Sequence, residues 1–305
     1  MGAMTPMTAL AQVVDLALLL LFPPLLVGVV NRVKAAFAGR AGAPLLQPWR
    51  DLLRLARKGV VLSRTTTWVF PLAPAVGVVA TLIAGLLVPL GPGESVLGFD
   101  GDLVLFAYLL ALGRFFTAAA ALDTGSPFEG MGAAREVTWA ALAELAVFFA
   151  LLCLVRLSGA LSLGPMLSAP VEGAVASVAL CVVGLVVVLL VECSRVPFDD
   201  PNTHLELTMI HEVMVLDHSG PLFGAVLYGA ALKLMVLGAV IVRLVLPAVE
   251  SPWLGRAAVL AALVVLAMGI GVIESVTARV RLQKAPDLIA GAALLTAFAF
   301  LLMVR

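Results

Sequence analysis

Eight long apolar stretches constrain the fold of this chain more than any other feature of its sequence. A helix that crosses a lipid bilayer needs about 20 mostly apolar residues, and each stretch is close to that length. Because backbone polar groups inside a membrane must be paired, we predict an all-α polytopic membrane protein with eight transmembrane helices. The predicted spans are residues 9–30, 68–90, 103–122, 137–157, 174–192, 222–246, 257–276 and 287–304.

The composition agrees with this prediction. Of the 305 residues, 62% are hydrophobic and 12% are charged, whereas a soluble domain carries about 25% charged residues. The connectors between the spans are too short to bury a core of their own, so we expect one integral membrane domain over residues 1–305. Asp15 interrupts the first apolar stretch and no basic segment precedes it, so we expect a retained helix there rather than a signal peptide.

Basic residues are concentrated in connectors that would share one side of the membrane. Segment 31–64 contains eight Lys and Arg residues against one acid, and segment 277–286 contains three. Connectors 91–102 and 158–173 contain none. Because short cytoplasmic loops carry the excess of Lys and Arg, we predict a protein of the inner, cytoplasmic membrane of a cell. Its basic connectors then face the cytoplasm and both termini face outside.

The first basic connector contains a predicted amphipathic helix, LLQPWRDLLRLARKG, which begins near Pro48 because proline suits the first turn of a helix. Apolar residues recur on one face at helical spacing, and basic residues gather on the other. Such a helix lies at a membrane surface, either as a plain anchor or as a docking surface for a soluble partner. The apolar face comprises Trp49, Leu52, Leu53 and Ala56, and the basic face comprises Arg50, Arg54, Arg57 and Lys58.

A second connector, VECSRVPFDDPNTHLELTMIHEVMVLDHSG (residues 191–220), holds six acids and all three histidines. Pro201 cannot lie deep inside a helix, and a capping-box spacing follows it. We therefore predict a connector helix over residues 203–219 that ends at Gly220. Because this connector is acidic and segment 31–64 is basic, we expect the two to pack together and partly neutralise each other.

The acidic residues and the histidines of the predicted connector helix lie on different faces. Glu206 and Asp217 are eleven residues apart, about three turns, so they share a face. The histidines are seven residues apart, which separates neighbouring imidazoles by about 10 Å along the axis, too far to share one metal ion. The cysteines have no CxxC spacing, so we interpret them as apolar fillers and expect no metal and no bound cofactor. These residues are His204, His211, His218, Cys153, Cys181 and Cys193.

Ionisable residues inside the predicted spans are functional candidates, because a charge in a membrane is costly. Glu144 lies in the fourth span on the same stripe of the helix as Glu136, and Lys233 lies near the middle of the sixth span. Two interpretations remain open: a polar path that carries protons from the cytoplasm into the membrane, or static ion pairs that hold helices in register. The other ionisable residues in or beside the spans are Asp15, Arg114, Arg135, Glu192 and Glu274.

Four segments together resemble one known family: LLQPWRDLLRLARK, LDTGSPFEGMGAAREVTWAALAE, ECSRVPFDDPNTHLELTMIHEVMVLDHSGP and IESVTARVRLQKAPDLIAGAALL. That family is the membrane-anchor subunit of group 4 energy-converting NiFe hydrogenases, including formate hydrogenlyase. It is itself similar to subunit 1 of respiratory NADH dehydrogenase. The form DDPNTHLELTMIHE favours the hydrogenase branch, and the resemblance implies an eight-span subunit without a metal or flavin.

The resemblance also implies roles for residues: a path of buried carboxylates and a docking surface beneath a redox module. Departures from the family pattern are Gly59 in place of an acid, Glu129 in place of a glycine, and Cys193 in place of Thr or Ser. The predicted proton path comprises Glu144, Glu192, Glu136, Asp199, Asp200, Glu206, Glu212, Asp217, Lys233 and Glu274. The predicted docking residues are Gln47, Pro48, Arg54, Arg135 and Arg195.

By this resemblance, the chain is expected to be a non-catalytic membrane subunit of an energy-converting NiFe-hydrogenase complex. Its implied partners are the hydrogenase large subunit, the iron–sulfur small subunit and antiporter-like membrane subunits, and the implied activity is the coupling of redox chemistry to proton or ion translocation. The alternative is the quinone-chamber subunit of an NADH dehydrogenase-type complex, or of a hydrogenase-related complex without nickel. A free-standing transporter would require repeat symmetry, which the sequence does not show, and nothing indicates binding of nucleic acid.

Overall fold

A computed structural model describes residues 6–91, 95–171, 173–199, 210–247, 249 and 251–304, and over these residues the chain is all-α, with no β-strand. Seven single helices are long and apolar enough to cross a membrane, and a bent helix pair provides an eighth candidate span. This agrees with the predicted eight-span plan. The seven are α4 (Val69–Leu87), α5 (Asp102–Asp123), α6 (Pro127–Ser158), α8 (Val175–Glu192), α10 (Gly220–Val245), α11 (Pro252–Val276) and α12 (Ala285–Val304), the last preceded by the 3₁₀ turn η1 (Leu282–Lys284).

The first predicted span, residues 9–30, is wrong as a single helix. It consists of α1 (Pro6–Leu21) and α2 (Pro23–Phe37), which meet at a bend of 45°. Pro23 and Pro24 lack a backbone N–H and cannot donate the hydrogen bonds that would continue α1. A hydropathy window counts these prolines as part of an apolar run, so it cannot detect the bend.

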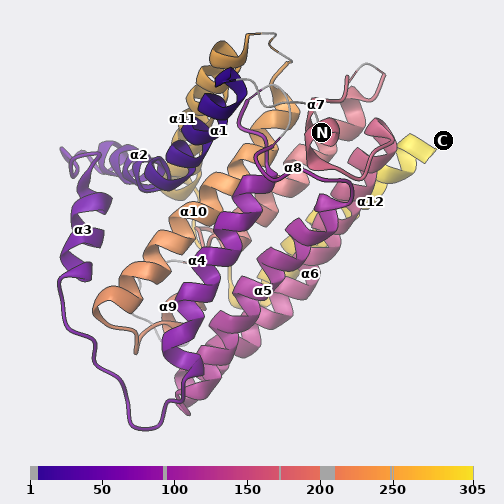
Figure 1. Ribbon diagram of the computed structural model, residues 1–305. Helices are drawn as coiled ribbons and strands as arrows, with labels where there is room; N and C mark the ends of the chain where they lie inside the picture. Colours follow the sequence, from indigo (N-terminus) through magenta and orange to yellow (C-terminus); the bar gives the residue numbers. More distant parts are fainter. Residues whose placement is uncertain are drawn as a thin grey trace.

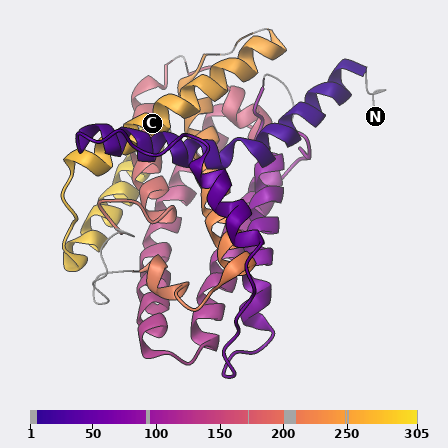
Figure 2. The same cartoon turned by 90° about the vertical axis from the view of Figure 1, so that its left-hand side faces the viewer.

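The long helices form a bundle with an inclined layer at one end. Figure 1 shows α4, α5, α6 and α10 running side by side, while α12 packs on α6 and α8. Figure 2 shows α1, α2 and α11 steeply inclined to this bundle, with α11 packed on α2. Small residues permit the close approaches, since a Cβ atom at Gly184 of α8 would collide with Thr296 of α12.

The amphipathic helix in the first connector is confirmed as α3 (Gln47–Ala56). It packs on α10 and α2. Its Trp49 donates a hydrogen bond from Nε1 to the carbonyl of Leu21 at 3.2 Å, and the indole lies 6.2 Å from the ring of Tyr228. On the predicted apolar face, Leu53 remains 56% exposed, so only part of that face packs against the rest of this chain.

The predicted connector helix over 203–219 is wrong in the part that the structure describes. Only the short helix α9 (His211–Met214) is present, and α10 begins at Gly220. Val213, Met214 and Val215 are all buried, and three consecutive buried residues do not fit a connector helix with a single packed face. The preceding residues 200–209, which include the capping-box sequence, lie outside the described residues.

The predicted packing of the two connectors is confirmed at one point. The backbone N–H of Val61 donates to Ser219 Oγ at 2.9 Å, and the Ser219 hydroxyl donates to the Val61 carbonyl at 3.1 Å. A Cβ atom at Gly220 would collide with the backbone of Gly59. This close backbone approach, together with the positive φ of 53° at Gly220, explains the need for glycine there.

Candidate functional site

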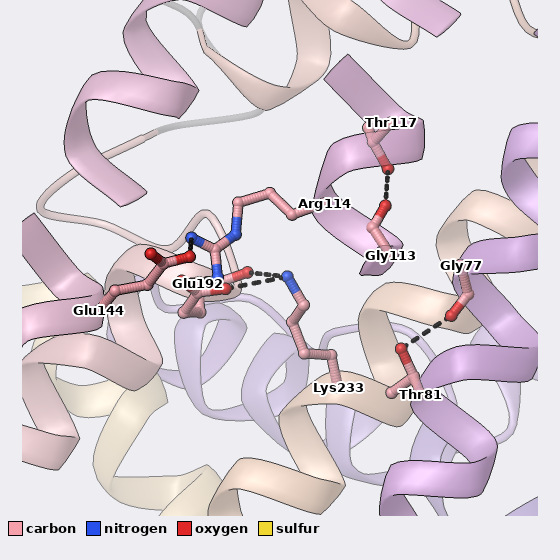
Figure 3. Close-up of polar contacts among 8 residues, drawn as sticks. All are labelled: Gly77, Thr81, Gly113, Arg114, Thr117, Glu144, Glu192 and Lys233. Atoms are coloured by element: carbon pink, nitrogen blue, oxygen red, sulfur yellow. Dashed lines mark hydrogen bonds and ion pairs between the residues drawn. The ribbon is translucent and has the colours of Figure 1, made fainter. Parts of the chain in front are cut away.

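Four charged side chains from four helices meet inside the bundle (Figure 3). Arg114 of α5 pairs with Glu144 of α6 (Nη1–Oε1 3.0 Å) and with Glu192 at the end of α8 (Nη2–Oε1 3.2 Å). Lys233 of α10 contacts the other carboxylate oxygen of Glu192 (Nζ–Oε2 3.1 Å) and its backbone carbonyl at 3.2 Å. We call Arg114, Glu144, Glu192 and Lys233 the ionic array.

The ionic array pairs two acids with two cations. The side chains of Arg114 and Glu192 are only 10% and 8% exposed, and an unpaired charge at such a place in a membrane helix bundle would be strongly unfavourable. Arginine keeps its proton in proteins, so Arg114 provides a fixed positive charge. The two carboxylates and Lys233 are the members that can exchange protons.

Glu144 differs from the rest of the array because its side chain is 56% exposed. It lines a cavity of about 260 Å³ with Tyr108 and Phe148, two aromatic residues that are themselves 72% and 56% exposed. An acid at the lateral surface of a membrane-spanning helix cannot face hydrocarbon without a large cost. This face of α5 and α6 is therefore suited to a polar neighbour rather than to lipid.

A second cavity, of about 70 Å³, reaches the array from inside the bundle. Besides members of the array, it is lined by Glu136, His211 and the two threonines Thr81 and Thr117. Both hydroxyls donate to a carbonyl of their own helix, at 2.8 and 3.0 Å (Figure 3). A water molecule needs about 10–15 Å³ of such volume, so the cavity has room for a few waters.

His211 stands in the connector at one end of this cavity. Burial, together with the positive charge of Lys233 and the neighbouring His218, lowers the pKa of His211 to about 4. The imidazole is therefore neutral near pH 7 and can both donate and accept a hydrogen bond. His218 also has a pKa lowered by burial, and its ring stacks on Phe70 with centroids 4.1 Å apart.

Arg114 and Glu192 line both cavities. The ion pair between them therefore stands where the inner cavity meets the lateral one. Arg114 connects Glu192, which borders the inner cavity, to Glu144 on the lateral face. The ionic array thus joins the interior of the bundle to its side.

Comparison with known proteins identifies the family. Residues 10–305 match the NADH dehydrogenase family over almost the whole chain. The chain belongs to this family. The recognition from its motifs is thereby confirmed.

Two relatives in this family come from Escherichia coli (strain K12). Hydrogenase-4 component C is 32% identical over 259 residues, which cover 84% of this chain and 80% of that protein. Formate hydrogenlyase subunit 4 is 30% identical over 292 residues, which cover 92% and 94%. These two proteins support the hydrogenase branch that the motifs favour.

A solved structure shares the fold. A chain of the membrane-bound sulfane sulfur reductase, an archaeal respiratory membrane complex, superposes with a TM-score of 0.80 over 97% of this chain and 99% of that one, at 21% sequence identity. This likeness concerns the fold. Together with the apolar helices, it identifies this member of the NADH dehydrogenase family as a multi-pass membrane protein.

Glu274, a predicted proton-path residue, belongs to a separate charge cluster. Its carboxylate pairs with Lys34 at 2.6 Å and with Arg195 at 3.3 Å, and its side chain is 1% exposed. Nearby in sequence, Arg279 approaches Asp199 at 3.9 Å. Arg195, predicted as a docking residue, is thus one of the cations that neutralise a buried carboxylate.

Asp199 organises the second connector. Its Oδ2 accepts hydrogen bonds from the backbone N–H groups of Ile210 at 3.3 Å and His211 at 2.9 Å. These contacts hold the start of α9 close to the end of α8. Two other predicted residues, Asp200 and Glu206, lie outside the described residues.

The remaining predicted site residues are spread over one end of the bundle. Gln47 donates to Asp51 at 2.9 Å, and Arg54 approaches the same carboxylate at 3.6 Å while remaining 67% exposed. Pro48 lies in the first turn of α3. Arg135 and Glu212 are half-buried, and Asp217 is exposed.

Arg114 was noted in the sequence as an ionisable residue within a span but was not included in the predicted proton path. It is the only charged residue within the third predicted span, and because a charge in a membrane is costly, such a residue is a functional candidate. Its pairing partners were not visible, because Glu144 and Glu192 come from helices far away in the sequence. Only the packing of α5 against α6 and α8 brings the three together.

Proposed function

We propose that this chain is the non-catalytic membrane subunit of an energy-converting NiFe-hydrogenase complex. One integral membrane domain over residues 1–305 anchors the soluble hydrogenase and iron–sulfur subunits and couples their redox chemistry to proton translocation. The observation that carries the proposal is the ionic array between two cavities. The similarity to formate hydrogenlyase subunit 4 and hydrogenase-4 component C directs it to hydrogenases.

The proposed proton path starts at the connector end of the bundle. Protons enter the small cavity beside Glu136 and His211 and reach Glu192. Protonation of Glu192 weakens both of its ion pairs, the one with Lys233 and the one with Arg114. Arg114 then turns fully to Glu144. The closer Arg114 cation favours the ionised form of Glu144, so Glu144 releases its proton sideways, out of this subunit, and the proton that entered stays on Glu192.

The exposed side chain of Glu144 supports an antiporter-like membrane subunit as the lateral partner. Such a partner would cover the 260 Å³ cavity and its aromatic rim, and it would replace lipid beside the carboxylate. The soluble hydrogenase subunits would bind at the opposite end of the path. There, the basic face of α3 and the second connector around Asp217 form the docking surface on the cytoplasmic side, with both termini outside.

The inner cavity has the size of a water-filled passage rather than of a quinone site. Pockets for drug-sized ligands measure about 300–1,000 Å³, whereas the inner cavity measures about 70 Å³. A quinone ring therefore has little room inside this inner cavity, whereas a few water molecules fit.

The test uses the complex purified with this subunit and reconstituted into vesicles. Glu144→Gln should lower proton translocation per hydrogen turned over at least about tenfold, because it removes a proton-exchanging group from the relay. Hydrogen turnover with an artificial electron carrier and the yield of complex should stay near those of the natural protein. The matched control is Asp287→Asn, which neutralises an exposed acid in the first turn of α12.

Two results would contradict the proposal. Loss of assembly in Glu144→Gln would indicate that the array is a static link between helices. A purified complex that contains no nickel and reduces quinone would support the NADH dehydrogenase-type alternative instead.

A further inference from the structure

Arg243 is a buried cation at the end of the bundle opposite α9. It lies in the last turn of α10, and the whole residue is only 6% exposed. Its Nη2 donates a hydrogen bond to Ser168 Oγ at 3.0 Å, and its Nε has no hydrogen-bond partner. A guanidinium offers five N–H donors, so this one is far from satisfied.

Three other arginines that are largely shielded from solvent show what Arg243 lacks. Arg256 has both oxygens of Asp15 within 2.8 Å, Arg114 has two glutamates, and Arg195 has Glu274. No ion pair joins Arg243 to any carboxylate among the described residues. A buried positive charge without a carboxylate partner is one of the least favourable arrangements in a protein, which favours an anionic ligand in the space beside Arg243.

The structure has a cavity at this place. It measures about 490 Å³ and is bounded by the end of α10, the start of α8, and α7 (Leu163–Ser168) with the segment that follows it. Arg243 and Ser168 supply its polar side chains. Most of its other lining is apolar, including Leu157, Met166 and Val178.

We infer that this cavity binds the phosphate headgroup of an anionic phospholipid. The guanidinium fork matches two oxygens of a phosphate, and such charge-assisted pairs are among the strongest in proteins. The cavity lies where membrane-spanning helices end, which is the depth of lipid headgroups. The apolar lining receives the glycerol backbone and the first methylenes of the acyl chains.

A free phosphate ion would also meet Arg243 and Ser168, but it would leave the apolar walls without a partner. A phospholipid satisfies both the cation and these walls. The lipid bound here is independent of the proton path, because Lys233, the member of the ionic array on α10, lies near the middle of that helix and Arg243 in its last turn. Lipid binding at Arg243 can therefore be tested separately from the proposed proton path.

Binding can be measured on the full-length protein in mild detergent by native mass spectrometry during titration with phosphatidylglycerol. Arg243→Gln should weaken the tightest lipid-binding step by about tenfold or more, the effect expected when hydrogen bonds to a charged group are lost. Ser168→Ala should cause a smaller loss in the same step. Arg156→Gln is the matched control, since Arg156 lies in the last turn of α6 beside the cavity residue Leu157 but is exposed.

A second titration with inorganic phosphate distinguishes the two sources of phosphate. We expect millimolar phosphate to leave the bound phosphatidylglycerol in place. Displacement of the lipid by phosphate would overturn the lipid assignment. Equal lipid binding by the natural protein, Arg243→Gln and Arg156→Gln would overturn the site, and if Arg243→Gln fails to fold, an unchanged affinity of Ser168→Ala would do so.

Discussion

Two sets of buried ion pairs in this protein use the same residue types in different ways. Asp15 of α1 and Arg256 of α11 form a closed pair, with Nε–Oδ1 and Nη2–Oδ2 distances of 2.7 and 2.8 Å. In the ionic array, by contrast, one guanidinium is shared between Glu144 and Glu192. The first set is a closed pair of two groups, and the second is a branched set of four.

The difference lies in the surroundings as much as in the pairing. Asp15 and Arg256 are both buried, and a further bond from Arg256 Nη1 goes to the carbonyl of Pro252 at 3.1 Å. The array borders two cavities and has one member, Glu144, that is largely exposed. A closed bidentate pair is suited to hold α1 on α11, whereas a branched array that borders two cavities fits the proposed proton path.

The sharpest test of this comparison is stability, and it has the largest expected effect. Arg256→Gln should destabilise the protein by about 3–5 kcal/mol, because it leaves Asp15 buried without its cation. Glu144→Gln should cost less than about 1 kcal/mol, because its side chain is 56% exposed. Unfolding in detergent measures both, and Asp15→Asn combined with Arg256→Gln should recover part of the loss. Equal destabilisation by Arg256→Gln and Glu144→Gln would contradict the distinction between a structural ion pair at Asp15 and Arg256 and a functional one at Glu144.

A smaller effect is expected from pH. The pKa of His211 falls from its ordinary 6.5 to about 4 in the folded protein, so the unfolded chain binds a proton that the folded chain rejects. The stability from neutral His211 is fully present above pH 6.5 and should be lost as pH falls toward 4, by up to about 3 kcal/mol. Unfolding of the natural protein and of His211→Gln at several pH values measures this, and identical pH profiles would contradict burial of the imidazole.

The smallest effect on stability is expected at the surface of α3. Arg54 is 67% exposed and lies 3.6 Å from Asp51, so Arg54→Gln should change stability by less than about 0.5 kcal/mol. If α3 is a docking helix, the same variant should reduce co-purification of the soluble hydrogenase subunits severalfold. Arg32, an exposed arginine of the neighbouring helix α2, provides the control variant Arg32→Gln. Equal recovery of the partners in both variants would leave α3 as a membrane anchor.

The sequence predicted the elements whose signal is local. The apolar runs of α4, α5, α6, α8, α10, α11 and α12 and the two-faced pattern of α3 are properties of neighbouring residues, and each is present in the structure. The family could be recognised for the same reason, since its motifs are short and contiguous. The roles of the predicted proton-path residues stay predictions until they are tested in a complex.

The errors have two causes: packing that overrides the local pattern, and prolines that a hydropathy window does not detect. The connector predicted as a helix over 203–219 has only the four helical residues of α9 in its described part, because Val213, Met214 and Val215 are buried together against the bundle. The first span bends at Pro23, where the apolar run continues but the hydrogen bonds do not. Hydropathy measures preference for the membrane and is blind to both effects.

By itself, the sequence determined that this protein is an all-α membrane protein, where seven of its long apolar helices lie, and which family it belongs to. It could do so because hydrophobic length and short motifs are properties of contiguous residues. The tertiary structure alone decided which charges meet. It paired Arg114 with Glu144 and Glu192, closed Asp15 on Arg256, and left Arg243 beside a cavity. A charge in a membrane must be neutralised by whatever group packing brings within about 4 Å, and that distance is set by how helices pack rather than by their order in the chain.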